Sequence, residues 1–412
     1  MNEIENTLKE DLAADGSQSG VEHEEDVIIN PFNPDDISIR TEVLPLEKFI
    51  RYIRLGKINM APDFQRSEVW NYTQKSQLIE SLILSIPLPM FYVSADEKEN
   101  WSVVDGLQRF STIRDFILGI DKKYYSKATF PYKGDGFRLK NMEFFDLYNG
   151  LYFKNLPDDI QGRILDSQFN VTIIQNGTPD EVKFNIFKRI NTGGVPLSPQ
   201  EIRHALNQGN ATDFLSHLSK LNCFLDTTCK SINPSRMADR ELVLRLIAFI
   251  IRGVGEFKSN DSMDSFLNTT MRIINTRLSE SDFSLIEEKF TTSMNRAKGL
   301  FGEAAFRKST FEKYQKTPIN KSLFDSVGFL LANLSDEIFD IIIEKKEIFK
   351  TILMSAVYEE QYFGRDSSKH IGVKARFEFM DTLVDFCLEN QLTDHQEKEY
   401  GEIIRRALRR IG

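Results

Sequence analysis

Hydrophobic positions first alternate and then recur at helical spacing along the N-terminal part of the chain. Residues 37–43 alternate and contain Ile, Thr and Val, so they predict a strand. Residues 45–54 place apolar side chains on one stripe and are followed by Gly56, as is typical of a short helix and its end. Thr73 is expected to cap a second helix. A strand and two helices are therefore expected at the start of an ordered region.

The next stretch predicts a strand, a tight turn and a helix in immediate succession. Residues 90–95 and 101–105 are strand-like and flank a polar linker, which favours a β-hairpin. Directly after the Asp-Gly pair at residues 105–106, apolar positions recur every three to four residues until Gly119. The second strand of the hairpin is therefore expected to turn straight into a helix.

Helical patterns dominate the remainder of the chain. Residues 121–150 are expected to form a loop with a short hairpin, and residues 169–175 a strand. Capping signals with a proline at the first helical position occur at residues 178–181 and 198–201, and Gly209 ends the second of these helices. Beyond this point the clearest apolar helices cover residues 241–251, 323–334 and 377–388.

These elements predict an α+β protein of two domains. A small α/β domain is expected over residues 36–209 and a mostly α-helical domain over residues 210–412. No fixed-period repeat occurs, which argues against a solenoid. Residues 1–35 are expected to form an acidic, disordered tail.

Charge is concentrated in that tail. Residues 1–26 hold nine carboxylates and one lysine, a net charge of −8, so the rest of the chain carries −9 + 8 = −1. The acidity therefore belongs to the tail and not to the folded body. A body close to neutral neither supports nor excludes nucleic-acid binding, because local patches decide that property.

Cysteine usage and hydropathy favour a cytoplasmic protein without a membrane partner. The three cysteines are Cys223, Cys229 and Cys387, an odd number that is typical of free thiols in a reducing compartment. No second Cys or His pair accompanies the first two, so a zinc site is not expected. No apolar run approaches the roughly 20 residues needed to cross a bilayer, and the acidic N-terminus is unlike a secretory signal.

The first candidate site is the sequence Asp105-Gly106-Leu107-Gln108-Arg109. A strand that turns into a helix through glycine leaves backbone N–H groups at the helix start, where the helix dipole favours an anion. Arg109 offers a planar guanidinium that suits phosphate oxygens, and Gln108 a group that orients a water or a base. Asp105 is a candidate ligand for a magnesium ion that would lie between its carboxylate and the phosphates. The same pattern is also typical of an N-cap aspartate followed by a surface arginine.

Two further motifs hold candidate ligands. Gln65 and Arg66 follow Phe64 in a loop before Trp70; this arginine is placed to reach a phosphate, to pair with Asp105 or simply to stack on the tryptophan. Farther along, Asn191-Thr192-Gly193-Gly194 ends a helix and suits either an ordinary C-cap or a loop that closes over a ligand.

Several catalytic signatures are missing from the sequence. The five histidines show no paired spacing, so a nuclease centre of the His-Asn-His type is not expected. Neither a G-x-x-x-x-G-K-[ST] loop nor a G-x-S-x-G elbow occurs. Two arginine pairs, at residues 405–406 and 409–410, favour a solvated basic last turn, with a nucleic-acid or partner contact as the alternative.

Four motifs in order resemble the domain-of-unknown-function 262 family, which forms the N-terminal domain of GmrSD-type modification-dependent restriction systems. They are Pro62–Trp70, Ile86–Pro89, Val103–Arg109 and Phe187–Leu197, and the resemblance covers residues 37–206. It implies a ParB/sulfiredoxin-like α/β fold that binds a nucleoside triphosphate, for which magnesium at Asp105 is a candidate companion. It also implies hydrolysis coupled to the sensing of modified or foreign DNA.

The resemblance assigns roles to particular residues. It implies that Asp105 and Gln108 act in catalysis. The residues that it assigns to the nucleotide are Gln65, Arg66, Gly106, Arg109, Ser111, Thr112 and Asn191. Leu107 departs from the family pattern, which has glutamine there, and this departure puts hydrolysis in question while leaving binding intact.

These observations leave three functional hypotheses. The leading one is a nucleotide-binding, NTP-hydrolysing protein of an anti-phage or modification-dependent restriction system, without a nuclease domain of its own. The second is a non-hydrolysing adaptor that senses DNA or docks a partner, such as a separately encoded nuclease, and Leu107 favours it. The third is a ParB-like nuclease in its own right.

Overall fold

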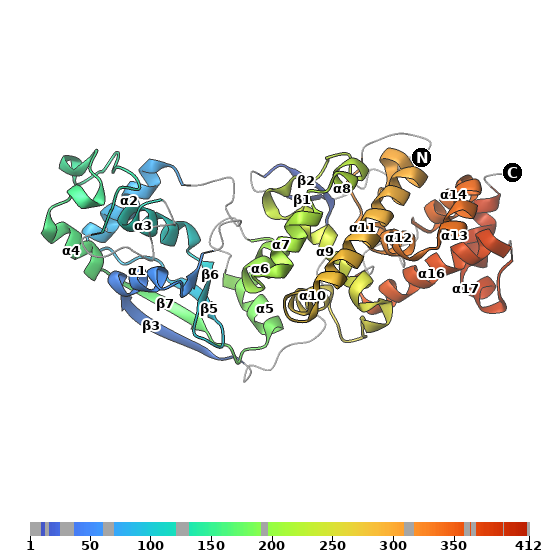
Figure 1. The fold of residues 1–412 in the computed structure, drawn as a ribbon, viewed down its shortest axis with the longest axis horizontal. Coiled ribbons are helices and arrows are strands. Elements are labelled where there is room, and N and C mark those ends of the chain that lie inside the picture. Colours follow the sequence, from blue (N-terminus) through green and yellow to red (C-terminus); the bar gives the residue numbers. More distant parts are fainter. Residues whose placement is uncertain are drawn as a thin grey trace, which may run out of the picture. The chain divides into compact units, whose positions relative to one another are not determined.

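A computed structural model of the chain describes two compact units (Figure 1). The described residues are 10–12, 16–24, 37–60, 70–120, 132–190, 197–308, 317–357, 363, 368–389 and 391–409. Residues 32–206 form the first unit, called here the α/β unit. Residues 1–31 together with residues 207–412 form the second, called the helical unit. The units divide after residue 206, slightly before the domain boundary expected at residue 209.

The α/β unit is built on a mixed sheet of five strands. The strand order is β3-β7-β5-β6-β4, with bounds Ile39–Pro45, Gln168–Ile174, Phe91–Ala95, Trp101–Asp105 and Ile58–Asn59. Strands β3 and β7 are antiparallel, as are β5 and β6, whereas β5–β7 and β4–β6 are parallel pairs. The predicted hairpin of β5 and β6 is thus confirmed, with Tyr92 opposite Asp105 at its open end.

Six helices accompany the sheet in the described part of this unit. They are α1 (Leu46–Arg54), α2 (Tyr72–Ile83), α3 (Leu107–Leu118), α4 (Asp158–Asp166), α5 (Asp180–Ile190) and α6 (Pro199–Leu206), with 3-10 turns at Asp146–Tyr148 and Phe153–Asn155. The predicted helices at α1, α2, α3, α5 and α6 are confirmed. Helix α4 was not anticipated from the sequence.

An aromatic stack forms the centre of the α/β core. Phe110 of α3 lies between Phe91 of β5 and Phe49 of α1, with ring centroids 4.1 Å and 4.2 Å away. Phe169 of β7 meets all three rings edge-on. Offset-stacked and edge-to-face pairs stabilise a core beyond simple burial. The stack therefore fixes the start of α3 against the end of the β5–β6 hairpin.

The helical unit agrees with the prediction of a mostly α-helical second domain. Its helices are α7 (Asn210–Leu218), α8 (Asn222–Thr227), α9 (Ala238–Arg252), α10 (Met263–Arg277), α11 (Glu280–Phe301), α12 (Lys321–Asn333), α13 (Asp336–Glu344), α14 (Lys346–Val357), α16 (His370–Glu389) and α17 (Asp394–Leu408), with 3-10 turns at Pro234–Arg236, Val254–Glu256 and Gly302–Ala304. The apolar helices expected at α9, α12 and α16 are confirmed and contribute to one hydrophobic core. None of the helices in the described residues is long and apolar enough to span a membrane.

The N-terminal segment differs from the disordered tail that its composition predicted. Strands β1 (Glu10–Leu12) and β2 (Gln18–Glu22) pair antiparallel within the helical unit. The side chain of Val21 is fully buried, and Val21 forms a parallel bridge with Ile319. Composition alone missed this order because the carboxylates of the segment find cationic partners only in the folded unit.

Local details correct two other expectations. Asn71, not Thr73, caps α2: its side chain accepts a hydrogen bond from the Gln74 backbone N–H, and the Gln74 side chain accepts one from the Asn71 N–H. Thr73 instead accepts a hydrogen bond from the side chain of Asn141. The short hairpin expected within residues 121–150 is absent from the described residues 132–150, which contain a 3-10 turn.

All three cysteines are free thiols. Cys387 is buried on α16, and burial raises its pKa to about 11. A thiolate is the reactive form, and a free cysteine has a pKa of about 8.5. We expect Cys387 to resist iodoacetamide at neutral pH in the folded protein, while the partly exposed Cys229 is alkylated. Peptide mass spectrometry before and after denaturation tests this, and labelling of Cys387 at the same rate as Cys229 in the folded state contradicts it.

Candidate functional site

The first candidate motif lies where β6 ends and α3 begins. Gly106 occupies the junction in a left-handed conformation, with φ of 89°. A Cβ atom at this position would lie 2.5 Å from Cδ1 of Phe91 and 3.2 Å from an Nη atom of Arg109. Both the backbone conformation and the space therefore require glycine here.

The turn at Gly106 presents the start of a helix. The first helical hydrogen bond runs from the Phe110 N–H to the Gly106 carbonyl, at 2.8 Å. The N–H groups of the three residues between them have no acceptor within the helix. Together with the helix dipole, these donors favour a negatively charged ligand at the end of the hairpin.

Arg109 is largely buried and makes specific contacts in this turn. One guanidinium nitrogen donates to the Pro89 carbonyl, and the other donates to the Met90 carbonyl at 3.2 Å and to Asp105 Oδ2 at 3.0 Å. The guanidinium also lies over the Phe91 ring, 4.4 Å from its centroid. Only 12% of the side chain is exposed. The arginine therefore ties the segment before β5 to the start of α3.

Arg109 retains hydrogen-bonding capacity after these contacts. A guanidinium has five N–H groups, and the contacts above use three of them. Burial lowers the pKa of Arg109, while the charge of Asp105 opposes that shift. An arginine remains protonated even so. The site therefore contains a largely desolvated guanidinium with N–H groups that these contacts do not use.

Asp105 ends β6 as the more exposed member of this ion pair. Its side chain is 36% exposed, three times the exposed fraction of Arg109. No group of three or more His, Cys, Asp or Glu side chains that could hold a metal occurs in the part of the chain that the structure describes. A magnesium ion at Asp105 would therefore take its remaining ligands from phosphate oxygens and water, as Mg²⁺ sites on nucleotides often do.

The other candidate residues on α3 separate into two groups. Gln108 and Ser111 are half-buried and lie one turn apart on the helix. Thr112 is fully buried, and its hydroxyl donates to the Gln108 carbonyl at 2.8 Å. Thr112 was predicted to contact a nucleotide, but its hydroxyl is not exposed in this structure. Leu107 packs against the core of the α/β unit.

The remaining predicted ligands lie outside the described residues. Gln65 and Arg66 fall within residues 61–69, and Asn191 falls within residues 191–196. Their roles stay predictions. The site that is described consists of Asp105, the Gly106 turn, the first turn of α3 and Arg109.

The sequence reasoning missed the backbone partners of Arg109. Pro89 and Met90 lie between α2 and β5, and their carbonyl groups receive the guanidinium. Phe91 supplies the ring beneath it. Residues 86–89 contain two prolines, which predict the end of a helix but carry no signal for a carbonyl contact with an arginine. Every residue has a backbone carbonyl, so the residue types at these positions do not show which carbonyls accept from Arg109.

Comparison with protein-family models identifies the family of the α/β unit. Residues 46–207 match the model of the GmrSD restriction endonuclease N-terminal domain. These residues form a GmrSD-type N-terminal domain. The GmrSD-type domain covers nearly the whole α/β unit and includes the complete Asp105–Arg109 turn. A search of curated proteins and a search of solved structures each find no match to the chain.

Proposed function

We propose that the GmrSD-type domain binds the phosphates of a nucleoside triphosphate at the start of α3, within a component of a restriction-type defence system. The observation that supports the proposal is the left-handed Gly106 turn, which begins α3 with N–H groups that have no acceptor within the helix, next to the largely buried Arg109 charge. The family name, that of a restriction endonuclease, supports the biological setting.

Each side chain of the turn has a part in this proposal. The unused N–H groups of Arg109 donate to phosphate oxygens, while its other donors hold the Pro89–Met90 carbonyls in place. Asp105 binds magnesium together with the phosphates. Gln108 orients the attacking water, and Ser111 contributes a hydroxyl from the same side of α3. Gln65, Arg66 and Asn191 are proposed to complete the site.

A second candidate function is nucleotide binding without turnover. Leu107 favours it, because its apolar side chain packs against the core where the family pattern has glutamine. In this case the domain acts as a nucleotide-dependent adaptor for DNA or for a separately encoded nuclease. Phosphate release measured with and without DNA separates the two functions: intact nucleotide affinity with no release would favour the adaptor.

Arg109→Ala is expected to weaken nucleotide binding by at least about tenfold, since a hydrogen bond to a charged group contributes about 1.5–3 kcal/mol. Calorimetry with GTP, ATP and CTP measures the effect. Arg51→Ala, at an exposed position on α1, is the matched control and should bind like the parent protein. If Arg109→Ala binds all three nucleotides with the affinity of the parent protein, the site lies elsewhere.

Because Arg109 also holds the turn together, a fold readout accompanies the affinity. Arg109→Lys keeps the positive charge but cannot donate in the planar geometry of a guanidinium. We expect it to bind more weakly than the parent protein and more tightly than Arg109→Ala. Thermal melting of the three proteins shows how much of each change follows from loss of stability.

A further inference from the structure

The α/β unit contains a second candidate site, at a cavity beside the start of α2. The cavity has a volume of about 610 Å³, and its lining includes Tyr72, residues 136–141, residues 149–150 and Tyr152. Cations and tyrosine rings gather at this cavity. We call them the basic surface, and its members are Tyr72, Lys75, Arg138, Lys140, Tyr152 and Lys154.

Hydrogen bonds hold the three segments of the basic surface together. The Leu139 N–H donates to the Leu151 carbonyl at 2.9 Å, and the Gly150 N–H donates to the Leu139 carbonyl at 2.8 Å. The Lys140 N–H donates to the Ser76 hydroxyl on α2, also at 2.9 Å. The cavity is therefore bounded by backbone that is fixed in place.

The side chains of this backbone alternate between the core and solvent. Phe137 and Leu139 are buried in the core of the unit. Arg138 and Lys140 are exposed, as is Lys154 in the neighbouring 3-10 turn. The buried side chains thus anchor a segment whose cations face water.

The cations of the basic surface are not neutralised within the described part of the chain. None of the four forms an ion pair there, and the cavity lining contains neither Asp nor Glu. Two carboxylates that lie nearby in the sequence are engaged by other groups: Asp135 pairs with Lys133 at 3.3 Å, and Asp146 accepts from the Asn149 amide at 3.3 Å. The surface therefore presents a concentration of positive charge to an anionic ligand.

Aromatic rings lie among these cations. The Arg138 guanidinium lies 5.0 Å from the centroid of the Tyr152 ring, and the Lys154 ammonium lies 5.6 Å from it. The Lys75 ammonium lies 5.7 Å from the centroid of the Tyr72 ring, and Tyr72 is 56% exposed. A surface for a nucleic-acid strand needs both kinds of group, because cations meet the phosphates while rings and guanidinium planes stack on unpaired bases.

The basic surface lies near the opposite end of α3 from the Gly106 turn. The ring of Phe137 packs against Phe116 in the last turn of α3, with centroids 5.1 Å apart. Arg109 is in the first turn of the same helix. At 1.5 Å per residue, roughly 10 Å of helix axis separates residues 109 and 116. The basic surface is therefore a separate site from the proposed phosphate site.

We propose that the basic surface binds single-stranded DNA, with phosphates at its cations and an unpaired base stacked on Tyr72. An acidic peptide would use the cations but not the exposed ring, and in a duplex the faces of the bases are already stacked on one another. The choice of DNA over RNA rests on the proposed function in a restriction-type system. The surface itself does not depend on nucleotide binding.

The first test removes two cations from the full-length chain, by Arg138→Gln and Lys140→Gln combined. Binding of a short fluorescein-labelled oligothymidylate is followed by fluorescence anisotropy in the absence of nucleotide. We expect the double variant to bind at least about tenfold more weakly, since each lost contact is a hydrogen bond between charged groups. The slope of log affinity against log salt should become shallower by about 1.4, because each phosphate contact on a single strand contributes about 0.7.

A matched control removes one arginine and one lysine elsewhere in the same unit. Arg51→Gln and Lys98→Gln change exposed positions on α1 and between β5 and β6, and should leave affinity and salt slope at the parent level. Equal weakening in the control overturns the proposal, because it would reflect net charge alone. Unchanged affinity in the Arg138→Gln, Lys140→Gln protein overturns it as well, as does a parent chain that does not bind the oligothymidylate.

The second test separates base stacking from charge. Tyr72→Leu should bind the oligothymidylate at least about fivefold more weakly, yet bind an abasic oligomer of the same length like the parent chain. Phe144→Leu, which changes an exposed ring outside the basic surface, is the control and should bind both oligomers normally. Equal losses on the two oligomers contradict stacking on Tyr72.

Further ligands and a fold readout complete the experiment. Tighter binding of a duplex of the same length overturns the preference for unpaired bases, and tighter binding of oligouridylate overturns the choice of DNA. Thermal melting accompanies each variant, and Lys154→Gln replaces the double variant if the latter melts at a much lower temperature.

Nucleotide calorimetry on the same proteins keeps the two proposals apart. Arg138→Gln with Lys140→Gln should bind nucleotide like the parent chain, and loss of nucleotide binding in a folded double variant overturns a separate site. If the parent chain binds the oligothymidylate but no nucleotide, the basic surface stands and the proposed phosphate site at Gly106 is rejected.

Discussion

Replacing Asp325 by alanine is expected to lower the free energy of unfolding of the helical unit by about 3–5 kcal/mol. Asp325 lies on α12 with no exposed surface. Its carboxylate receives Arg245 at 2.6–3.1 Å and Arg376 at 3.3 Å. Both arginines are as deeply buried as Asp325.

The large effect follows from what alanine would leave behind. A buried charge that loses its partner keeps its desolvation penalty without compensation, so breaking such a pair costs far more than the pair contributes. The pKa of Arg376 shows the balance already: burial lowers it, the charge of Arg245 lowers it further, and Asp325 opposes both. Without Asp325, Glu24 would remain as the carboxylate that hydrogen-bonds Arg245, next to two buried arginines.

Chemical denaturation of the full chain measures this change, with Asp336→Ala as the control. Asp336 also pairs with an arginine, Arg296, but its side chain is 92% exposed. Exposed ion pairs contribute at most about 1 kcal/mol, so the control should change stability little. Equal losses for the two variants would contradict a special role for the buried cluster.

Replacing Gly106 by alanine is expected to disrupt the candidate site and to destabilise the α/β unit. A non-glycine residue in a left-handed conformation costs about 1–3 kcal/mol. The added Cβ would also lie 2.5 Å from the Phe91 ring, and overpacking of a core costs about 1–3 kcal/mol more. The guanidinium of Arg109 packs against the Phe91 ring, so a shift of this ring should weaken nucleotide binding as well.

Gly56→Ala separates the two causes. Gly56 has a comparable φ of 68°, yet a Cβ atom there would meet nothing within 4 Å. The control therefore carries the backbone cost without the crowding and leaves Arg109 undisturbed. Thermal melting and nucleotide calorimetry on both variants give the comparison, and a Gly106→Ala protein that is as stable as Gly56→Ala and binds nucleotide normally would show that the turn tolerates a side chain.

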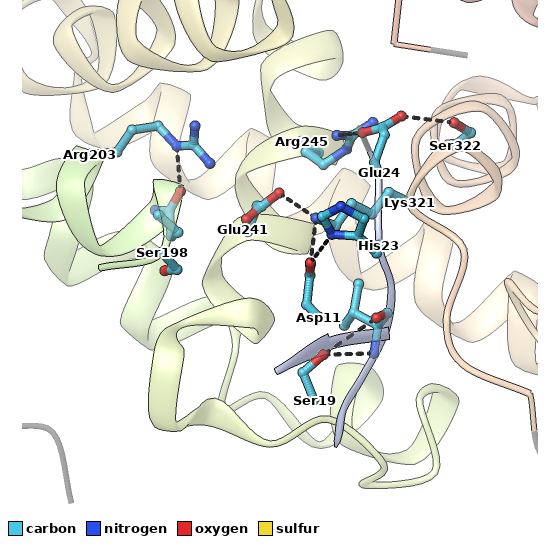
Figure 2. Close-up of polar contacts among 12 residues, drawn as sticks. Asp11, Ser19, His23, Glu24, Ser198, Arg203, Glu241, Arg245, Lys321 and Ser322 are labelled. Carbon is cyan, nitrogen blue, oxygen red and sulfur yellow. Dashed lines mark hydrogen bonds and ion pairs between the residues drawn. The ribbon is translucent and has the colours of Figure 1, made fainter. Parts of the chain in front are cut away.

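Each unit contains a buried arginine paired with carboxylates, but the two arginines differ in how many of their donors are used. In the α/β unit, Arg109 pairs with a partly exposed aspartate and keeps unused donors, as a binding site requires. In the helical unit, Arg245 is saturated by Asp325 and Glu24. Glu24 belongs to the N-terminal segment (Figure 2), which joins the helical unit through the bridge between Val21 and Ile319.

Local pattern determined much of the α/β unit. The strand–turn–helix at residues 101–118, the β5–β6 hairpin and the start of α5 each depend on neighbours within a few positions, which periodicity and capping residues report directly. The position of Asp105, Gly106 and Arg109 at one turn was predictable for the same reason. The order of four motifs then identified the domain, which the family match over residues 46–207 bears out.

Tertiary structure decided what those residues contact. Arg109 finds carbonyls 19 and 20 positions earlier, Asp325 joins arginines 80 and 51 positions away, and Glu22 meets Asn320 across 298 positions. Composition predicted disorder for the acidic segment because, taken alone, it cannot bury enough apolar surface to remain ordered. Its order depends on the distant Arg245 and on a bridge to Ile319, and neither partner is in place until the helical unit has folded.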